Sequence, residues 1–113
     1  MEQVRVRDLR PLVQELVRDG RQLLLLDVRD PWERQLAQMT LPGATTLAIP
    51  MPQVPQRLAE LDPDWDVLVL CHHGMRSLQV AMFLDRQGYP DVHNVMGGID
   101  AWSHLIDPTV PRY

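Results

Sequence analysis

The residues best suited to do chemistry lie in one short stretch, VLVLCHHGMRS, which runs from Val67 to Ser77. This stretch contains the only cysteine of the chain, Cys71, directly after an apolar run. A cysteine thiolate is a nucleophile that can form covalent intermediates. A lone cysteine at the end of a buried strand is more often an inert hydrophobic residue. The glycine, arginine and serine that follow Cys71 favour the functional interpretation.

The segment after Cys71 is suited to surround a negative charge. A strand is predicted to end directly before the cysteine, and a helix is predicted to begin a few residues later. Free N–H groups at a helix N-terminus attract anions, and Gly74 permits a positive φ that lets several N–H groups converge. The anion is either the thiolate itself or a bound oxyanion. We expect Cys71 to be the catalytic residue. The substrate-binding loop is expected to consist of His72, His73, Gly74, Met75, Arg76 and Ser77.

The rest of the chain supplies the elements that position this loop. Apolar strand-like runs alternate with longer helix-like segments, which is typical of α/β proteins. This pattern predicts a small open sheet, mostly parallel, with helices on both faces. In such sheets ligands bind beyond the carboxyl ends of the strands, which is where Cys71 is expected to lie. The predicted strands are Gln3–Val6 at an edge, Leu23–Val28, Thr45–Ile49, Val67–Leu70 and Val92–Val95.

Helices are predicted between the strands. Asp30, Pro31 and Glu33 have the spacing of an N-cap, a first-turn proline and a capping-box partner, and they begin a helix that extends through Ala37. A second helix is predicted over Val54–Leu61. A third follows Arg76 and ends at Gly88, and a short fourth follows Gly97 and Gly98 and contains Ala101 and Trp102.

Composition limits the function. The 113 residues suit one globular domain, residues 1–113, and 45% hydrophobic with 23% charged residues excludes disorder. The net charge of −4 provides no basic surface for nucleic acid or an anionic membrane, so neither partner is expected. No apolar run is long enough to cross a membrane. A single cysteine cannot form an internal disulfide, and we expect a cytoplasmic protein.

The stretch CHHGMRS resembles the active-site loop of single-domain rhodaneses, which are sulfurtransferases that carry sulfur as a cysteine persulfide. The resemblance also includes LLLLDVRDPWE, LPGATTLAIP and VMGGIDAW, so it covers nearly the whole chain. It implies a five-stranded, mostly parallel sheet. It also implies that Cys71 takes sulfur from thiosulfate or a related donor and passes it to cyanide or a thiol, including a thiol on a protein. No cofactor is implied.

The resemblance extends to residues outside the loop. Asp27 and Arg29 match the Asp-x-Arg of the family, which lies near the mouth of the active site. Arg29 is expected close to the substrate, whereas Asp27 has either a catalytic or a structural role. The resemblance implies that Arg76 shapes the loop and attracts an anionic donor. One departure is the segment Met39–Ala44, which lacks the Gly-His pair common before the Pro-Gly turn and leaves the local geometry there open.

Other functions remain open at this point. Related phosphatases and arsenate reductases have one more residue between cysteine and arginine, and the shorter spacing from Cys71 to Arg76 suits sulfur better than an oxyanion. A binding module without turnover, or a persulfide carrier, is a further alternative. A metal site of Cys71, His72 and His73 is not expected, because adjacent side chains rarely converge on one ion. The two histidines are unusual in this loop, and their charge is expected to depend on pH.

Overall fold

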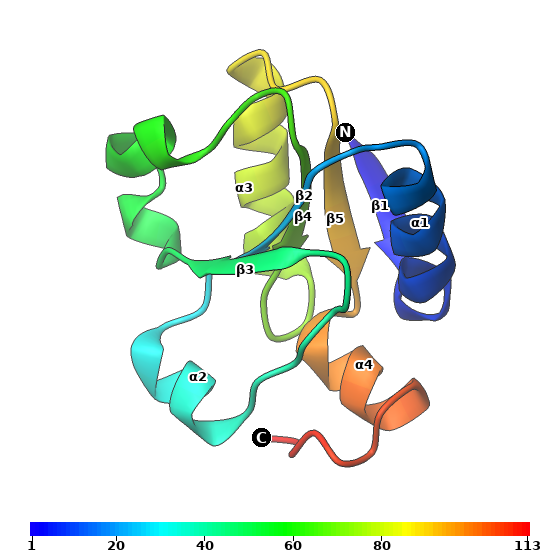
Figure 1. The fold of residues 1–113 in the computed structure, drawn as a ribbon. Coiled ribbons are helices and arrows are strands. Elements are labelled where there is room, and N and C mark those ends of the chain that lie inside the picture. The colour runs from blue at the N-terminus through cyan, green and yellow to red at the C-terminus, as the bar shows by residue number, and fades with distance from the viewer.

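The computed structural model describes all 113 residues, and its centre is a five-stranded sheet (Figure 1). The strands lie in the order β1-β5-β4-β2-β3, and all four pairings are parallel. The predicted α/β fold is confirmed, with a sheet that is parallel throughout. The strands are β1 (Glu2–Arg5), β2 (Leu23–Asp27), β3 (Thr45–Ala48), β4 (Asp66–Leu70) and β5 (Val92–Met96).

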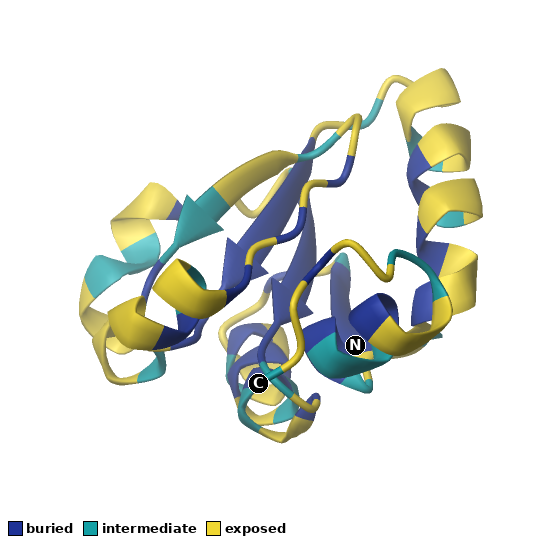
Figure 2. Ribbon diagram, turned by 90° about the horizontal axis from the view of Figure 1, so that it is seen from below, coloured by how far each residue is buried: buried dark blue, intermediate teal, exposed yellow.

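Helices cover both faces of the sheet, as predicted. One face packs against α1 and α4, and the other packs against α3 and two short 3-10 helices. The central strands β2 and β4 are buried at every position (Figure 2). Their successive side chains alternate between the two cores, which explains why both strands are apolar except for Asp27 at the end of β2 and Asp66 at the start of β4. The helices are α1 (Val6–Arg18), α2 (Pro31–Leu36), α3 (Met75–Arg86), α4 (Gly98–Leu105), η1 (Met51–Gln53) and η2 (Pro55–Glu60).

Helix α1 was not predicted from the sequence. The expected edge strand ends at Arg5, and Val6 begins this helix of 13 residues. Its buried residues Val6, Leu9 and Val13 have helical spacing and face the sheet. Pro11 lies inside the helix and removes one backbone donor, which weakened the local signal for a helix.

The helix predicted over Val54–Leu61 is present, but as the 3-10 helix η2 rather than as an α-helix. The 3-10 helix η1 directly precedes it, and each of the two has a proline in its first turn. Arg57 leaves the helical region, with φ −115° and ψ 22°. The prolines lack the N–H groups that a continuous α-helix needs, so the chain turns in short steps.

The remaining elements agree with their predicted positions to within one or two residues. The capping box before α2 is present, since the Asp30 N–H donates to the Glu33 carboxylate at 3.0 Å. The segment without the Gly-His pair still forms its turn, in which the Ala44 N–H donates to the Leu41 carbonyl at 3.0 Å. No helix is both long and apolar enough to span a bilayer.

Candidate active site

The carboxyl ends of β2, β4 and β5 lie side by side, and the loops that follow them form the candidate site. The Val28 N–H donates to the Leu70 carbonyl at 3.0 Å, which joins the end of β2 to that of β4. At the start of α4, the Ile99 N–H donates to the Cys71 carbonyl at 3.0 Å. Cys71 is thus fixed between two neighbouring loops.

The Cys71 sulfur is surrounded by hydrogen-bond donors. The side chain is buried, and its Sγ accepts from the N–H groups of Gly74 at 3.1 Å and Ser77 at 3.3 Å. The thiol donates to the Ser77 hydroxyl at 3.2 Å, and this hydroxyl can donate in turn to a thiolate. The loop therefore surrounds the Cys71 sulfur with two backbone donors and one hydroxyl.

Two glycines allow the loop to pack closely on the start of α4. Gly74 has a φ of +97°, and a Cβ built there would lie 2.9 Å from the Gly97 nitrogen. A Cβ on Gly98 would lie 2.4 Å from the His72 carbonyl oxygen and 2.5 Å from that of Cys71. Asn94 of β5 also holds the loop, because its Nδ2 donates to the Gly74 carbonyl at 3.2 Å.

Arg76 is held by Glu33, which comes from α2. The two terminal nitrogens of Arg76 donate to the two carboxylate oxygens of Glu33, each at 2.7 Å, so the ion pair is bidentate. These hydrogen bonds lower the pKa of Glu33 to about 2 against the opposing effect of burial. The same contact raises the pKa of Arg76. From its sequence position Glu33 was expected only in the capping box, whereas its carboxylate also joins α2 to the Cys71 loop.

Asp27 and Arg29 form a second, fully buried pair beside the loop. The Arg29 Nη2 donates to Asp27 Oδ2 at 2.8 Å and to the Ala37 carbonyl at 2.9 Å. Its Nη1 donates to the Tyr113 hydroxyl at 3.0 Å. The Arg29 side chain has an exposed fraction of 0%. The structure thus places both residues in an internal network, in which Arg29 has protein partners rather than an open face toward substrate.

The two histidines of the loop lie at its outer side. The His72 ring stacks on Tyr113 with centroids 3.9 Å apart and planes 9° apart. It also lies against the His73 ring, with centroids 3.9 Å apart and planes tilted by 31°. Burial, followed by the nearby His73, lowers the pKa of His72, so this imidazole becomes charged only at a more acidic pH than a free one. His73 and Met75 are exposed.

The comparisons with known proteins place the chain in a family. The model of the family described as "Rhodanese-like domain" matches residues 10–105. The chain belongs to the rhodanese-like family. This domain is 42% identical over 92 residues to a protein named "Sulfurtransferase" from Allochromatium vinosum, which covers 81% of this chain and 82% of the relative. It is 36% identical over 96 residues to the "Putative sulfurtransferase YtwF" of Bacillus subtilis, covering 85% and 88% of the two chains.

Other relatives are longer proteins. The domain is 42% identical over 93 residues to the "Rhodanese-like/PpiC domain-containing protein 12, chloroplastic" of Arabidopsis thaliana, which covers 79% of this chain but 30% of that protein. Among solved structures, a rhodanese-related protein from Thermoplasma volcanium superposes with a TM-score of 0.73 at 26% identity over the whole of both chains. Rhodanese-like domains similar to this one therefore occur both alone and as parts of larger proteins.

Three residues that contact the loop of this rhodanese-like domain were missed from the sequence. Asn94 lies in a strand, Asp100 lies in the first turn of α4, and Tyr113 is far from the loop in sequence. The Tyr113 hydroxyl donates to Glu33 Oε1 at 2.9 Å. Only Asp100 had a local signal, because it follows the two glycines of the VMGGIDAW stretch.

Proposed function

We propose that this rhodanese-like domain is a sulfurtransferase that carries sulfur as a persulfide on Cys71. The observation that carries the proposal is the arrangement around the Cys71 sulfur, in which two backbone N–H groups and the Ser77 hydroxyl lie within 3.3 Å. Such donors stabilise a thiolate before the reaction and the terminal sulfur anion of a persulfide after it. The sulfurtransferase names of the bacterial relatives support the same reaction class.

The first step takes sulfur from the donor. The Cys71 thiolate attacks the outer sulfur of thiosulfate, and a new S–S bond forms while the S–S bond of thiosulfate breaks. Sulfite leaves with the electron pair of that bond. The cysteine then carries one additional sulfur with a negative charge, which lies among the loop N–H groups. No external oxidant or reductant is consumed, because the electron pair leaves with sulfite.

The second step returns the enzyme to its starting state. Cyanide, or the thiolate of a small molecule or protein, attacks the terminal sulfur of the persulfide. The S–S bond to Cys71 breaks, and the cysteine leaves as a thiolate. The product is thiocyanate or a new persulfide. One cysteine is sufficient for this cycle, because the Cys71 sulfur is the nucleophile in the first half-reaction and the leaving group in the second.

The other loop residues have supporting roles in this proposal. Ser77 and Gly74 contact the reacting sulfur, whereas His72, His73 and Met75 form the outer part of the loop that the donor meets. Arg76 shapes the loop through Glu33 and adds positive charge for an anionic donor. We propose that Asp27 and Arg29 support the loop from inside. The chemistry needs a free thiol, which favours a reducing compartment such as the cytoplasm.

Intact-protein mass spectrometry after incubation with thiosulfate tests the proposal. The native protein is expected to gain one sulfur atom, and cyanide is expected to remove it with release of thiocyanate. Cys71→Ser is the matched control and should gain nothing. If the native thiol is alkylated by iodoacetamide but gains no sulfur from thiosulfate or from a glutathione persulfide, the sulfurtransferase proposal is wrong. Assays with a phosphate ester and with arsenate would then test the oxyanion alternative.

A further inference from the structure

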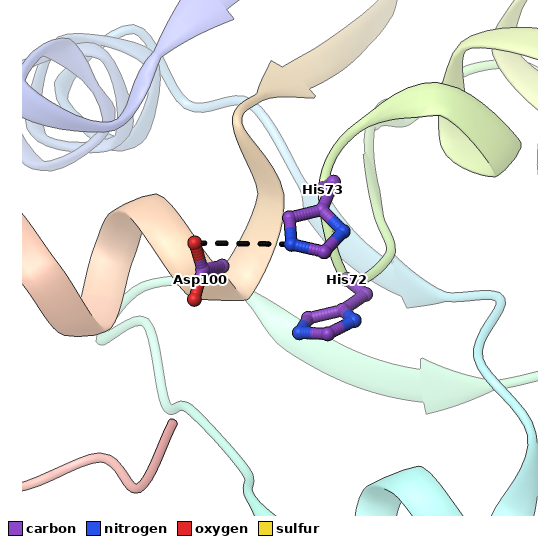
Figure 3. Close-up of side chains that lie close together, drawn as sticks. All are labelled: His72, His73 and Asp100. Carbon is purple, nitrogen blue, oxygen red and sulfur yellow. Dashed lines mark ion pairs between the residues drawn. The ribbon is translucent and has the colours of Figure 1, made fainter. Parts of the chain in front are cut away.

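A group of possible metal ligands lies at the outer edge of the Cys71 loop. His72, His73 and Asp100 each offer one ligand atom, and these atoms all lie within 4.8 Å of one another. Figure 3 shows both imidazole rings with a nitrogen on the side that faces the Asp100 carboxylate. The closest ion pair in the group joins His73 Nε2 and Asp100 Oδ2 at 3.9 Å. The three side chains thus face a common point from two elements of the fold.

Backbone hydrogen bonds hold the loop and the start of α4, which carry these side chains, in a fixed relation. The Asp100 N–H donates to the His72 carbonyl at 3.0 Å, and the neighbouring Ile99 N–H donates to the Cys71 carbonyl at 3.0 Å. Gly98 packs so closely on the two carbonyls that a Cβ would not fit. The loop and the start of α4 therefore form one unit. Ligands held in advance by the fold bind a metal at a lower conformational cost.

The His72 ring has an additional feature that indicates a missing partner. Its Nε2 is buried and makes no hydrogen bond of normal geometry within the fold. A buried nitrogen without a partner is costly, and most such atoms in folded proteins are satisfied. The stacks with Tyr113 and His73 hold the ring in place without satisfying this nitrogen. A metal ion that accepts the lone pair of an imidazole nitrogen would satisfy it.

We propose that His72, His73 and Asp100 form a binding site for a divalent transition metal ion, specifically Zn²⁺. Two imidazoles and one carboxylate are ligands that zinc prefers, and three protein ligands leave a fourth position for water. The metal atom would bind about 2.0–2.2 Å from each ligand atom, so binding requires the three side chains to turn inward from their present separation of up to 4.8 Å. This site differs from the set of Cys71, His72 and His73 considered from the sequence, because Asp100 replaces the thiol. The two adjacent histidines were expected not to converge, but their ring centroids lie 3.9 Å apart and one nitrogen of each lies within 4.8 Å of the other and of an Asp100 oxygen.

Arg112 competes with the metal for the carboxylate. Its Nε donates to Asp100 Oδ1 at 3.1 Å, and its Nη2 donates to Oδ2 at 3.3 Å. The arginine side chain is 55% exposed, so it can move away into solvent. Metal binding replaces this surface ion pair. Removal of the arginine charge should therefore strengthen zinc binding, by up to about fivefold for an exposed pair.

Isothermal titration of the metal-free protein with Zn²⁺ tests the proposal. The wild-type protein is expected to bind one ion, Asp100→Asn and His73→Gln are expected to bind at least about tenfold more weakly, and Arg112→Gln more tightly. Glu60→Gln is the matched control, because it removes an exposed carboxylate that is not among the proposed ligands and that pairs with Arg57 rather than with Arg112, so it should leave the affinity unchanged. Circular dichroism confirms that each variant is folded.

The cysteine provides the decisive comparison. Cys71→Ser is expected to bind Zn²⁺ as the wild type does, and Co²⁺ bound to the wild type is expected to show no thiolate charge-transfer absorption. If zinc binding is lost in Cys71→Ser but kept in Asp100→Asn and His73→Gln, the thiol is the ligand and the proposal is wrong. It is equally wrong if the wild type binds no zinc. The test does not depend on sulfur transfer, so it is separate from the proposed function.

Discussion

Glu33 provides a direct test of how the candidate site is held together. Its carboxylate accepts two hydrogen bonds from Arg76 at 2.7 Å, one from the Tyr113 hydroxyl at 2.9 Å and one from the Asp30 N–H at 3.0 Å. Its side chain is only 3% exposed. Glu33→Gln removes the charge while it keeps the shape of the side chain. We expect this change to lower the free energy of unfolding substantially at neutral pH.

The magnitude follows from the pKa of the carboxyl group. A pKa lowered from 4.5 to about 2 in the folded state corresponds to about 3 kcal/mol in favour of the charged form. A group whose pKa is lowered by folding stabilises the protein above its unfolded pKa, and this contribution is lost as the pH falls through the folded pKa. The stability difference between wild type and Glu33→Gln should therefore be about 2–3 kcal/mol at pH 7 and should shrink between about pH 5 and pH 2.

Urea unfolding followed by circular dichroism, at several pH values from 7 down to 3, measures this difference. Glu60→Gln is the matched control, because Glu60 also accepts two hydrogen bonds from one arginine, Arg57, at 2.6 and 2.9 Å. The Glu60 side chain is 43% exposed, so solvent screens its pair and its loss should have a much smaller effect. The reasoning is refuted if the two substitutions cost the same, or if the effect of Glu33→Gln does not change with pH.

Two further predictions concern the loop. Gly98→Ala should destabilise the fold by about 1–3 kcal/mol more than Gly88→Ala in urea unfolding, because its Cβ would clash with the carbonyls of Cys71 and His72, whereas Gly88 has the same kind of positive φ and no atom within 4 Å. If both substitutions lower the free energy of unfolding equally, the Cys71 loop can move away from the added Cβ at position 98, and the predicted clash is wrong. Ser77→Ala should slow persulfide formation by about 10- to 100-fold, since it removes a hydroxyl beside the charged sulfur. An unchanged rate in the mass-spectrometric assay would exclude a role of this hydroxyl.

Local sequence patterns were sufficient to predict the sheet and the position of Cys71. The strands β2 and β4 are apolar at nearly every position because both faces are covered, and this pattern is visible in the sequence itself. The Asp30 and Glu33 spacing likewise predicted the start of α2, since a capping box involves residues only three positions apart. Structural features that depend only on residues close together in the sequence could therefore be predicted.

Contacts between residues far apart in the sequence could not be predicted. Glu33 and Arg76 are 43 positions apart, and Glu33 and Tyr113 are 80 positions apart, so no local pattern connects them. The metal-ligand group was missed for the same reason, because Asp100 approaches the two histidines only after α4 has packed on the loop. Helix α1 was missed for a local reason, since Pro11 interrupts an otherwise helical pattern.

The arginines near Cys71 act mainly as links between elements. Arg29 is paired with Asp27, and Arg76 is paired with Glu33, so most of their charge is balanced within the protein. The donors that contact the sulfur are instead the two backbone N–H groups and the Ser77 hydroxyl. Backbone N–H groups stabilise a negative charge locally and do not require a net positive protein. The persulfide proposed for Cys71 is therefore compatible with a domain whose net charge is −4.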